Sequence, residues 1–406
     1  MKKTTKNQLG SPEAQPSLTI RGLFNIKKFR GHFIAFVIFN VFLFIWMGLG
    51  HGQVHFDKFD YSKNSLHYVQ DSRVNNPESF NLLRALGQYD SQFYLKIADT
   101  GYSTNPPNRA DTQTYAFSPA YPILIAGVHL AIPSLELSAL VVSQALLLLC
   151  FVLIYWAVTR WYSFALAGKA AWLLFLSPFS IFYRGYFSEG LFLALLIIYL
   201  DAIRSKKWLV AALSAGFLVT TRFVGLAAIL VLAGMLLVEL RNKKINLTRA
   251  VKYLCLSIIP LAVFMLFCFL KTGNPLFFIK VRALWWVPYP IPFAPLYAIA
   301  NFWSLNWHRF HSSRVDVISI VLAGVLIYKS RRWLPRSWWY TSLLLWFIPL
   351  VTSDTMSASR YQIVNFPLFV YAAYVLKRHT YRTVVVVSAL ALMYVSIYFV
   401  NWYWVG

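Results

Sequence analysis

Residues 81–122 have the sequence NLLRALGQYDSQFYLKIADTGYSTNPPNRADTQTYAFSPAYP, which lies between strongly apolar segments yet carries several acidic residues. Its apolar residues recur at helical spacing: Leu82, Leu86, Tyr89, Phe93 and Ile97. This periodicity predicts one amphipathic helix over residues 79–98, terminated by Gly101. Between membrane spans, such a helix is expected to lie along the bilayer surface. Asp90 stands beside the apolar stripe and is therefore a candidate base for chemistry on a lipid-linked substrate.

The composition of the whole chain is that of a polytopic membrane protein. Of its 406 residues 58% are hydrophobic, and the mean hydropathy is +0.55. The formal net charge of +24 would also suit nucleic-acid binding, but Lys and Arg occur in short clusters between apolar runs, as in cytoplasmic loops. We therefore expect no nucleic-acid partner. All three cysteines lie inside apolar runs, which predicts neither a disulfide framework nor a metal site.

The order of apolar runs and basic clusters predicts the topology. Residues 1–31 are basic and polar and are expected to form a disordered cytoplasmic tail, followed by one integral membrane domain over residues 32–406. The run 32–49 is interpreted as an uncleaved anchor rather than a signal peptide, because no small-residue cleavage site follows it. The later runs predict an all-α protein of about eleven spans, with the N-terminus inside and the C-terminus outside. Residues 121–132 are too few to cross and are expected to be re-entrant or interfacial.

The first loop of this topology is unusually acidic. Residues 51–119 contain seven of the fourteen acidic residues of the chain, against six Lys and Arg. Elsewhere basic residues dominate, so we expect this loop to lie outside and to contribute to catalysis, over residues 51–120. The alternative is an acidic, solvated loop without a catalytic role.

Charged residues from several segments are expected to meet on the outer face: Asp90, Arg184, Glu189, Arg222, Lys271, Lys280, Arg282 and Arg360. A carboxylate near several cations suits sugar transfer from a polyprenyl phosphate, which needs a base for the acceptor hydroxyl and cations for the departing phosphate. Glu189 would either orient an acceptor hydroxyl or neutralise Arg184. No glycine-rich phosphate loop is present, and no His, Asp or Glu cluster has the spacing of a metal site, so neither a cofactor nor a metal is predicted.

Several motifs resemble those of the PIG-V-type mannosyltransferases. Residues 89–102, YDSQFYLKIADTGY, are similar to the family's "WD…(W/H)(F/Y)L…IA..GY", with Tyr89 in place of the usual Trp. Residues 116–122, AFSPAYP, resemble "AFFP.(F/Y)P", with Ser118 in place of the second Phe. Four further segments resemble later family motifs in the same order along the chain: residues 177–189, 220–225, 271–278 and 359–369.

This resemblance implies a bacterial-type GT-C glycosyltransferase in a prokaryotic plasma membrane. Its expected reaction moves a hexose, with mannose favoured, from a polyprenyl-phosphate donor to a lipid or glycan acceptor at the outer face. Asp90 is then the catalytic base of an inverting displacement. The resemblance assigns the donor phosphate to Arg222, Arg360 and Arg282, and substrate contacts to Tyr89, Arg184, Glu189 and Trp285. The competing interpretations are a transporter or flippase, in which the same cations capture a lipid phosphate, and a non-catalytic membrane scaffold.

Overall fold

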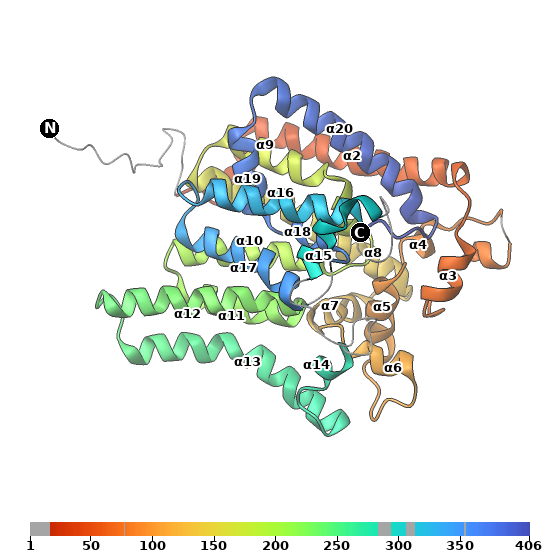
Figure 1. Cartoon of the computed structure of the whole chain (residues 1–406), viewed down its shortest axis with the longest axis horizontal. Coiled ribbons are helices and arrows are strands. Elements are labelled where there is room, and N and C mark those ends of the chain that lie inside the picture. The colour runs from red at the N-terminus through yellow and green to blue at the C-terminus, as the bar shows by residue number, and fades with distance from the viewer. Residues whose placement is uncertain (1–16, 77, 283–293, 306–312, 353–354) are drawn as a thin grey trace.

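The computed structural model describes residues 17–76, 78–282, 294–305, 313–352 and 355–406. Within these ranges the chain is all α-helical and contains no strand. The longer helices run lengthwise through the molecule in Figure 1, and short helices gather at one end. The longer helices are α2 (Lys27–Gly50), α8 (Leu135–Trp161), α9 (Phe164–Phe175), α10 (Glu189–Arg204), α11 (Trp208–Thr221), α12 (Leu226–Arg241), α13 (Leu247–Thr272), α16 (Arg314–Ser330), α17 (Arg336–Thr352), α19 (Phe366–Val375) and α20 (Arg378–Val400).

In the part of the chain that the structure describes, five helical segments are long and apolar enough to cross a membrane: Lys27–Gln53, Leu135–Trp161, Phe223–Arg241, Leu247–Thr272 and Arg378–Val400. The prediction of a multi-pass membrane protein is confirmed at this level. The other predicted spans are also helical but shorter, so the structure supports five spans by length where the sequence suggested about eleven. The segment predicted to be too short to cross forms α7 (Ala120–His129).

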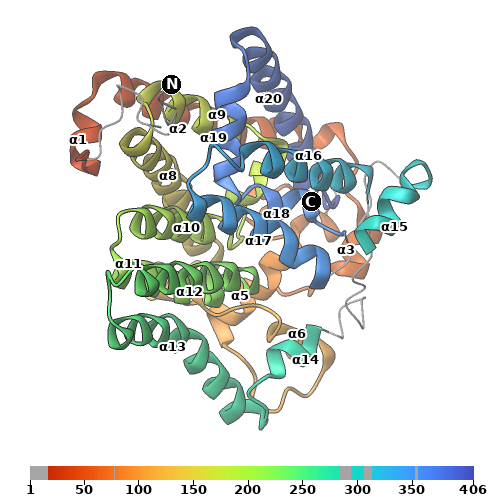
Figure 2. The same cartoon turned by 60° about the vertical axis from the view of Figure 1, so that its left-hand side comes forward.

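Apolar side chains on the outermost helices indicate where lipid would cover the protein. In Figure 1, α2 and α20 lie side by side along one edge and α13 lies along the opposite edge. Leu49 on α2 is 78% exposed and Leu270 on α13 is 72% exposed, in the company of many other exposed apolar residues. Exposing such apolar faces to water is unfavourable, whereas contact with the hydrocarbon of a bilayer is not. The inner helices pack in layers, and Figure 2 shows α11 between α10 and α13.

The predicted amphipathic helix over residues 79–98 is not continuous. It divides into α4 (Leu82–Ala85) and α5 (Asp90–Thr100), with Tyr89 at a φ of 45° between them. A positive φ is costly for a residue with a side chain and needs tertiary contacts to hold it. The Tyr89 hydroxyl donates to the Asp60 carboxylate and, over 2.7 Å, to the Trp402 carbonyl. These distant contacts override the local helical period.

The apolar stripe of this region is covered by protein rather than by lipid. Leu86, Tyr89, Phe93 and Ile97 are all buried. α5 packs against α7, and the Tyr94 ring meets the Tyr121 ring edge-on at 5.2 Å. The expectation that this helix lies along the bilayer surface is therefore wrong.

The acidic first loop folds into short helices at one end of the bundle. These are the 3-10 helix η1 (His51–Gln53), α3 (Lys58–Asn64), the 3-10 helix η2 (Ser72–Val74), α4, α5 and α6 (Arg109–Thr114). In Figure 1 they lie at the right-hand end, while the basic turn between α12 and α13 lies at the left-hand end. Residues 57–111 are thus separated from this basic turn by the length of the bundle, as the predicted topology requires.

A buried ion pair fastens the first loop to the last helix. Arg73 is 3% exposed and donates twice to Asp71, over 2.9 and 2.7 Å. Its other hydrogen bonds go to the Asn401 side chain and to the Val400 carbonyl at the end of α20. All three guanidinium nitrogens of Arg73 are therefore hydrogen-bonded. We call Asp71 and Arg73 with these two acceptors the Asp71–Arg73 staple.

Part of the predicted N-terminal tail is helical. Residues 20–25 form α1 (Ile20–Asn25), in which Leu23 is fully buried. The Trp156 indole on α8 donates to the Leu18 carbonyl over 2.9 Å. Residues 1–16 lie outside the described part of the chain.

Candidate functional site

Asp90 is the first residue of α5, placed there by the bend at Tyr89. Its side chain is 26% exposed, which leaves the carboxylate accessible at the end of the bundle that carries the first loop. Its Oδ2 accepts a hydrogen bond from Arg360 Nη1 over 2.7 Å. Across the described residues, Asp90 Oδ1 has no hydrogen-bond partner. One oxygen of Asp90 is thus oriented by an arginine while the other can accept a proton.

Arg360 also reaches a second carboxylate. It lies on the short helix α18 (Ala358–Gln362) and its Nε donates to Glu189 Oε1 at the start of α10. The same Oε1 accepts from Arg222 Nη1 at the end of α11. An acidic residue at a helix N-terminus is favourably placed in the field of the helix dipole. Asp90, Glu189, Arg222 and Arg360, from four separate helices or helix ends, together form what we call the arginine–acid cluster.

Aromatic rings surround the Arg360 guanidinium. Its carbon lies 4.6 Å from the Phe182 ring centre and 4.7 Å from that of Phe187. Arg360 is 2% exposed. Burial by itself lowers the pKa of an arginine, but the neighbouring carboxylates Glu189 and Asp90 outweigh burial and raise the pKa of Arg360. Arg360 therefore stays charged in an apolar surrounding.

The arginine–acid cluster keeps hydrogen-bonding capacity that the protein itself does not use. Within the described ranges, Arg360 Nη2 and Glu189 Oε2 are buried and have no hydrogen-bond partner. Gln88 and Ser91, which lie on either side of Asp90 in the sequence, also have buried side-chain polar atoms without partners in the described part of the chain. Leaving a buried polar group unpaired costs about 1–3 kcal/mol. Within the arginine–acid cluster, Arg360 Nη2 and Glu189 Oε2 therefore leave hydrogen-bonding capacity that a polar ligand could use.

The turn that presents Arg222 depends on a glycine. Arg222 is followed by the 3-10 helix η4 (Phe223–Gly225), which folds back onto the end of α11. A Cβ on Gly225 would lie 2.3 Å from the backbone carbon of Leu218, so no larger residue fits. The Arg222 guanidinium lies 5.0 Å from the ring centre of Tyr361, the residue that follows Arg360. The tight turn thereby brings Arg222 against α18.

Arg282 lies at the edge of this region. It ends α14 (Phe277–Arg282), is exposed, and lies 5.7 Å from the centre of the Phe223 ring, directly after Arg222. The exposed Lys280 shares this helix. The two carboxylates and two guanidiniums of the arginine–acid cluster have no net charge together. Lys280 and Arg282 on α14 therefore give this region a net positive charge.

Other predicted site residues have different surroundings. Arg184 is fully buried and donates to Asn40 Oδ1 and to Ser180, each through short contacts of 2.8–2.9 Å, so it does not pair with Glu189. Glu189 therefore neutralises Arg222 and Arg360 instead. Tyr89 is 4% exposed and holds the bend before Asp90. Trp285 lies outside the described residues. Lys271 donates to Thr104 Oγ1 over 3.1 Å.

Asp316 is a buried acid whose role the sequence reasoning missed. It lies in the first turn of α16 and is 1% exposed. Its Oδ1 accepts from the Ser359 backbone N–H over 3.0 Å and from the Ser359 hydroxyl over 2.9 Å. Since Ser359 precedes Arg360, Asp316 fixes the start of α18. A single carboxylate inside an apolar run is itself a sign of a specific role, and this signal was available in the sequence.

No group of three or more His, Cys, Asp and Glu side chains within the described ranges could hold a metal ion. Comparisons with protein-family models, with curated protein sequences and with solved structures gave no match. The resemblance to PIG-V-type mannosyltransferases therefore consists of the short motifs quoted above, and the geometry of the arginine–acid cluster stands beside it as separate evidence.

Proposed function

We propose that this chain is a membrane glycosyltransferase of the GT-C type. It moves a hexose, with mannose favoured, from a polyprenyl-phosphate donor to a lipid or glycan acceptor at the outer membrane face. The observation that carries the proposal is the pairing of the accessible Asp90 carboxylate with a buried arginine that retains an unpaired Nη2. A base beside cations is what displacement of a phosphate by a hydroxyl requires.

The residues divide the reaction between them. Asp90 Oδ1 accepts the proton of the acceptor hydroxyl, and the hydroxyl oxygen of the acceptor bonds to the anomeric carbon of the donor sugar. The bond from that carbon to the phosphate oxygen breaks on the opposite face, so the configuration inverts. Arg222 and Arg360 stabilise the negative charge on the departing polyprenyl phosphate, with Arg282 at the entrance. Before the donor binds, Glu189 neutralises the buried Arg360 and the partly buried Arg222.

The test is transfer of label by the purified full chain. Protein in lipid nanodiscs is incubated with radiolabelled polyprenyl-phosphate mannose and a membrane lipid extract, and the label should move to a new species. Asp90→Asn should lower the rate by about 10²–10⁴-fold, the usual loss when a general base is removed. Donor binding should persist in this variant.

Asp99→Asn is the matched control. Asp99 lies on the same helix, is exposed, and accepts a hydrogen bond from the Tyr68 hydroxyl, away from the arginine–acid cluster. It should retain most of the activity. Near-normal transfer by Asp90→Asn contradicts the proposed mechanism. A donor that crosses the bilayer without being consumed supports a flippase instead.

A further inference from the structure

Asp60 and Asp71 are two acids of the first loop with different partners. Asp71 is paired with Arg73 in the Asp71–Arg73 staple. Asp60, on α3, forms no ion pair with any residue that the structure describes. Its Oδ1 accepts from Asn64 Nδ2, and its Oδ2 contacts the Tyr89 hydroxyl. A half-buried carboxylate with only neutral partners is costly to keep ionised, which favours its protonated form.

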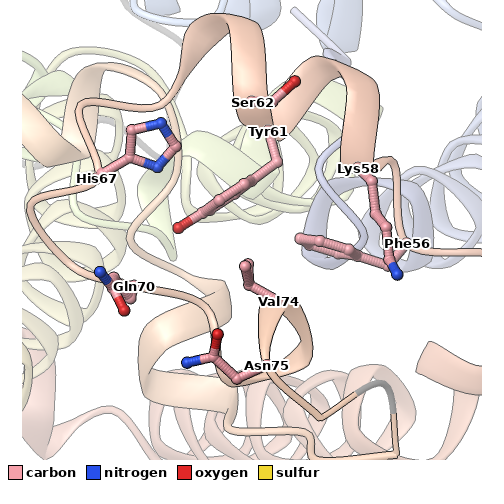
Figure 3. A pocket seen from close by; sticks show the side chains of 8 residues that line it. All are labelled: Phe56, Lys58, Tyr61, Ser62, His67, Gln70, Val74 and Asn75. Atoms are coloured by element: carbon pink, nitrogen blue, oxygen red, sulfur yellow. The ribbon is translucent and has the colours of Figure 1, made fainter.

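Asp60 takes part in the packing of α3 against the rest of the protein. Figure 3 shows the residues of α3 that line a hollow in the first loop: Lys58, Tyr61 and Ser62. Asp60 is not among the residues that line this hollow, and its carboxyl group contacts Tyr89 instead. The Tyr89 ring lies 5.0 Å from the Trp402 ring, in the segment after α20. Asp60 therefore lies where α3, the bend at Tyr89 and the segment after α20 meet.

The Tyr89 hydroxyl has one proton for two neighbouring acceptors. It contacts Asp60 Oδ2 and lies 2.7 Å from the Trp402 carbonyl oxygen. If Asp60 is ionised, the hydroxyl can donate fully to only one of these oxygens. If Asp60 is protonated on Oδ2, the acid donates to the Tyr89 oxygen and Tyr89 donates to Trp402, so both contacts are hydrogen bonds. Burial and the charge of Asp60 raise the pKa of Tyr89, so Tyr89 keeps its own proton in both cases.

We infer that Asp60 is a positioning residue that acts in its protonated form and completes a hydrogen-bonded chain from Asp60 through Tyr89 to Trp402. Tyr89 has a φ of 45° and directly precedes Asp90, so this chain holds the bend that places the proposed base. The effect of Asp60 on sugar transfer rests on the proposed function, whereas its protonation and its hold on the bend do not.

The charges around Asp60 set the direction of the pH dependence. Burial raises the pKa of Asp60 and the charge of Asp57 adds to this effect, whereas the hydrogen bonds of Tyr89 and Asn64 and the charge of Lys63 lower it. Residues 401–405 contribute no charged side chain. Together these groups leave the pKa of Asp60 above its ordinary value. The chain is therefore complete at low pH and is lost as the pH rises through the raised pKa.

Infrared difference spectroscopy of the full chain in nanodiscs tests the protonation. Over about pH 3–8, the wild type should show the absorption of a protonated carboxyl group that Asp60→Asn lacks and that disappears as the pH rises. Asp57→Asn is the matched control, since asparagine also suits a helix N-cap. It should keep this absorption with a lower midpoint, because a neighbouring negative charge is removed. Absence of the absorption, or a wild-type midpoint at or below the ordinary value of about 3.9, overturns the inference.

Hydrogen exchange tests the positioning role. In Asp60→Asn the side-chain oxygen accepts from Asn64 and the side-chain nitrogen donates to Tyr89, which copies the protonated acid at every pH. At about pH 8, the backbone amides of residues 86–95 should therefore exchange about three- to tenfold more slowly in Asp60→Asn than in the wild type, the effect of one hydrogen bond. Near pH 3 the two proteins should exchange equally.

Sugar transfer at about pH 8 should be faster in Asp60→Asn than in the wild type by a similar factor. Equal exchange at both pH values, or equal transfer rates at about pH 8, overturns the positioning role. An exchange difference without any transfer by the wild type leaves the hydrogen-bonded chain standing and removes the proposed function.

Discussion

The Asp71–Arg73 staple and the Glu189–Arg360 pair of the arginine–acid cluster are both buried and both charged, and both lie at the end of the bundle that carries the first loop, but they differ in completeness. In the staple, every guanidinium nitrogen of Arg73 is hydrogen-bonded, and the acceptors include the end of α20. In the cluster, Arg360 Nη2 and Glu189 Oε2 remain without partners within the described residues. Burial of charge therefore serves two purposes in this protein.

The difference separates a structural ion pair from a binding site. A buried pair with all its hydrogen bonds made has nothing left to offer a ligand, and removing one partner leaves an uncompensated charge. A buried cluster with unpaired groups carries a cost that a ligand can remove. Stability should therefore depend chiefly on the staple, and donor binding chiefly on the cluster.

Arg73→Gln should produce the largest loss of stability. It leaves Asp71, which is 2% exposed, without its counter-charge, and breaking a buried pair in this way costs about 3–5 kcal/mol. Thermal unfolding of the purified protein measures the loss. Arg84→Gln, an exposed arginine of the same loop, should change the stability by no more than about 0.5 kcal/mol. Equal stability of Arg73→Gln and the wild type would remove the distinction drawn above.

Arg222→Gln and Arg360→Gln should mainly weaken donor binding. Each removes a charge-assisted contact worth about 1.5–3 kcal/mol, which corresponds to about one to two powers of ten in Kd. Titration with a non-transferable polyprenyl-phosphate analogue measures this, and Arg84→Gln again serves as the control. If neither substitution changes donor affinity, the arginine–acid cluster does not hold the phosphate.

Asp316→Asn should have a smaller effect of the same kind. The amide nitrogen cannot accept the hydrogen bonds that one carboxylate oxygen receives from Ser359, and each bond contributes about 1 kcal/mol. Because Ser359 positions Arg360, donor affinity should fall by about three- to tenfold. Ser313→Ala is the comparison, since Ser313 donates to Asp316 Oδ2 over 2.7 Å on the other side of the carboxylate. Equal donor affinity for both variants and the wild type would exclude a positioning role for Asp316.

Asp60→Asn should have the smallest effect, visible as a change with pH. Burial raises the pKa of Asp60 above its ordinary value. The folded protein then binds the Asp60 proton more tightly than the unfolded chain, so this contribution to stability is complete below about pH 3.9 and is lost as the pH rises through the raised pKa. The melting temperature of Asp60→Asn relative to the wild type should therefore rise between pH 4 and pH 7. A constant difference over this range contradicts the expectation.

The sequence predicted the helices well because long apolar runs have few alternatives. The predicted anchor over residues 32–49 lies within α2 (Lys27–Gly50), and the segment 121–132 forms α7 (Ala120–His129). The break before Asp90 was missed because its cause is tertiary: the contacts of Tyr89 with Asp60 and Trp402 lie far away in the chain. A local period carries no information about such contacts.

The candidate site was predicted in part for a related reason. Motif order and topology suggested that Asp90, Glu189, Arg222 and Arg360 share the outer face, and the structure brings all four together. Arg184 lies at the same end, but its donors are taken by Asn40 and Ser180, which spacing alone does not reveal. Which charges meet is decided by side-chain contacts across as many as 270 positions of sequence.

The staple has a consequence for the biogenesis of the protein. Arg73 and Asn401 are separated by 328 positions, so the first loop leaves the ribosome long before its anchor does. At roughly 5–20 residues per second, the delay is on the order of 20–60 s. During this interval the segment containing Asp90 lacks both Arg73's contacts with α20 and Tyr89's contact with Trp402. The end of the bundle that carries the first loop is therefore assembled last, and nascent chains arrested before residue 400 lack the contacts that hold the bend before Asp90.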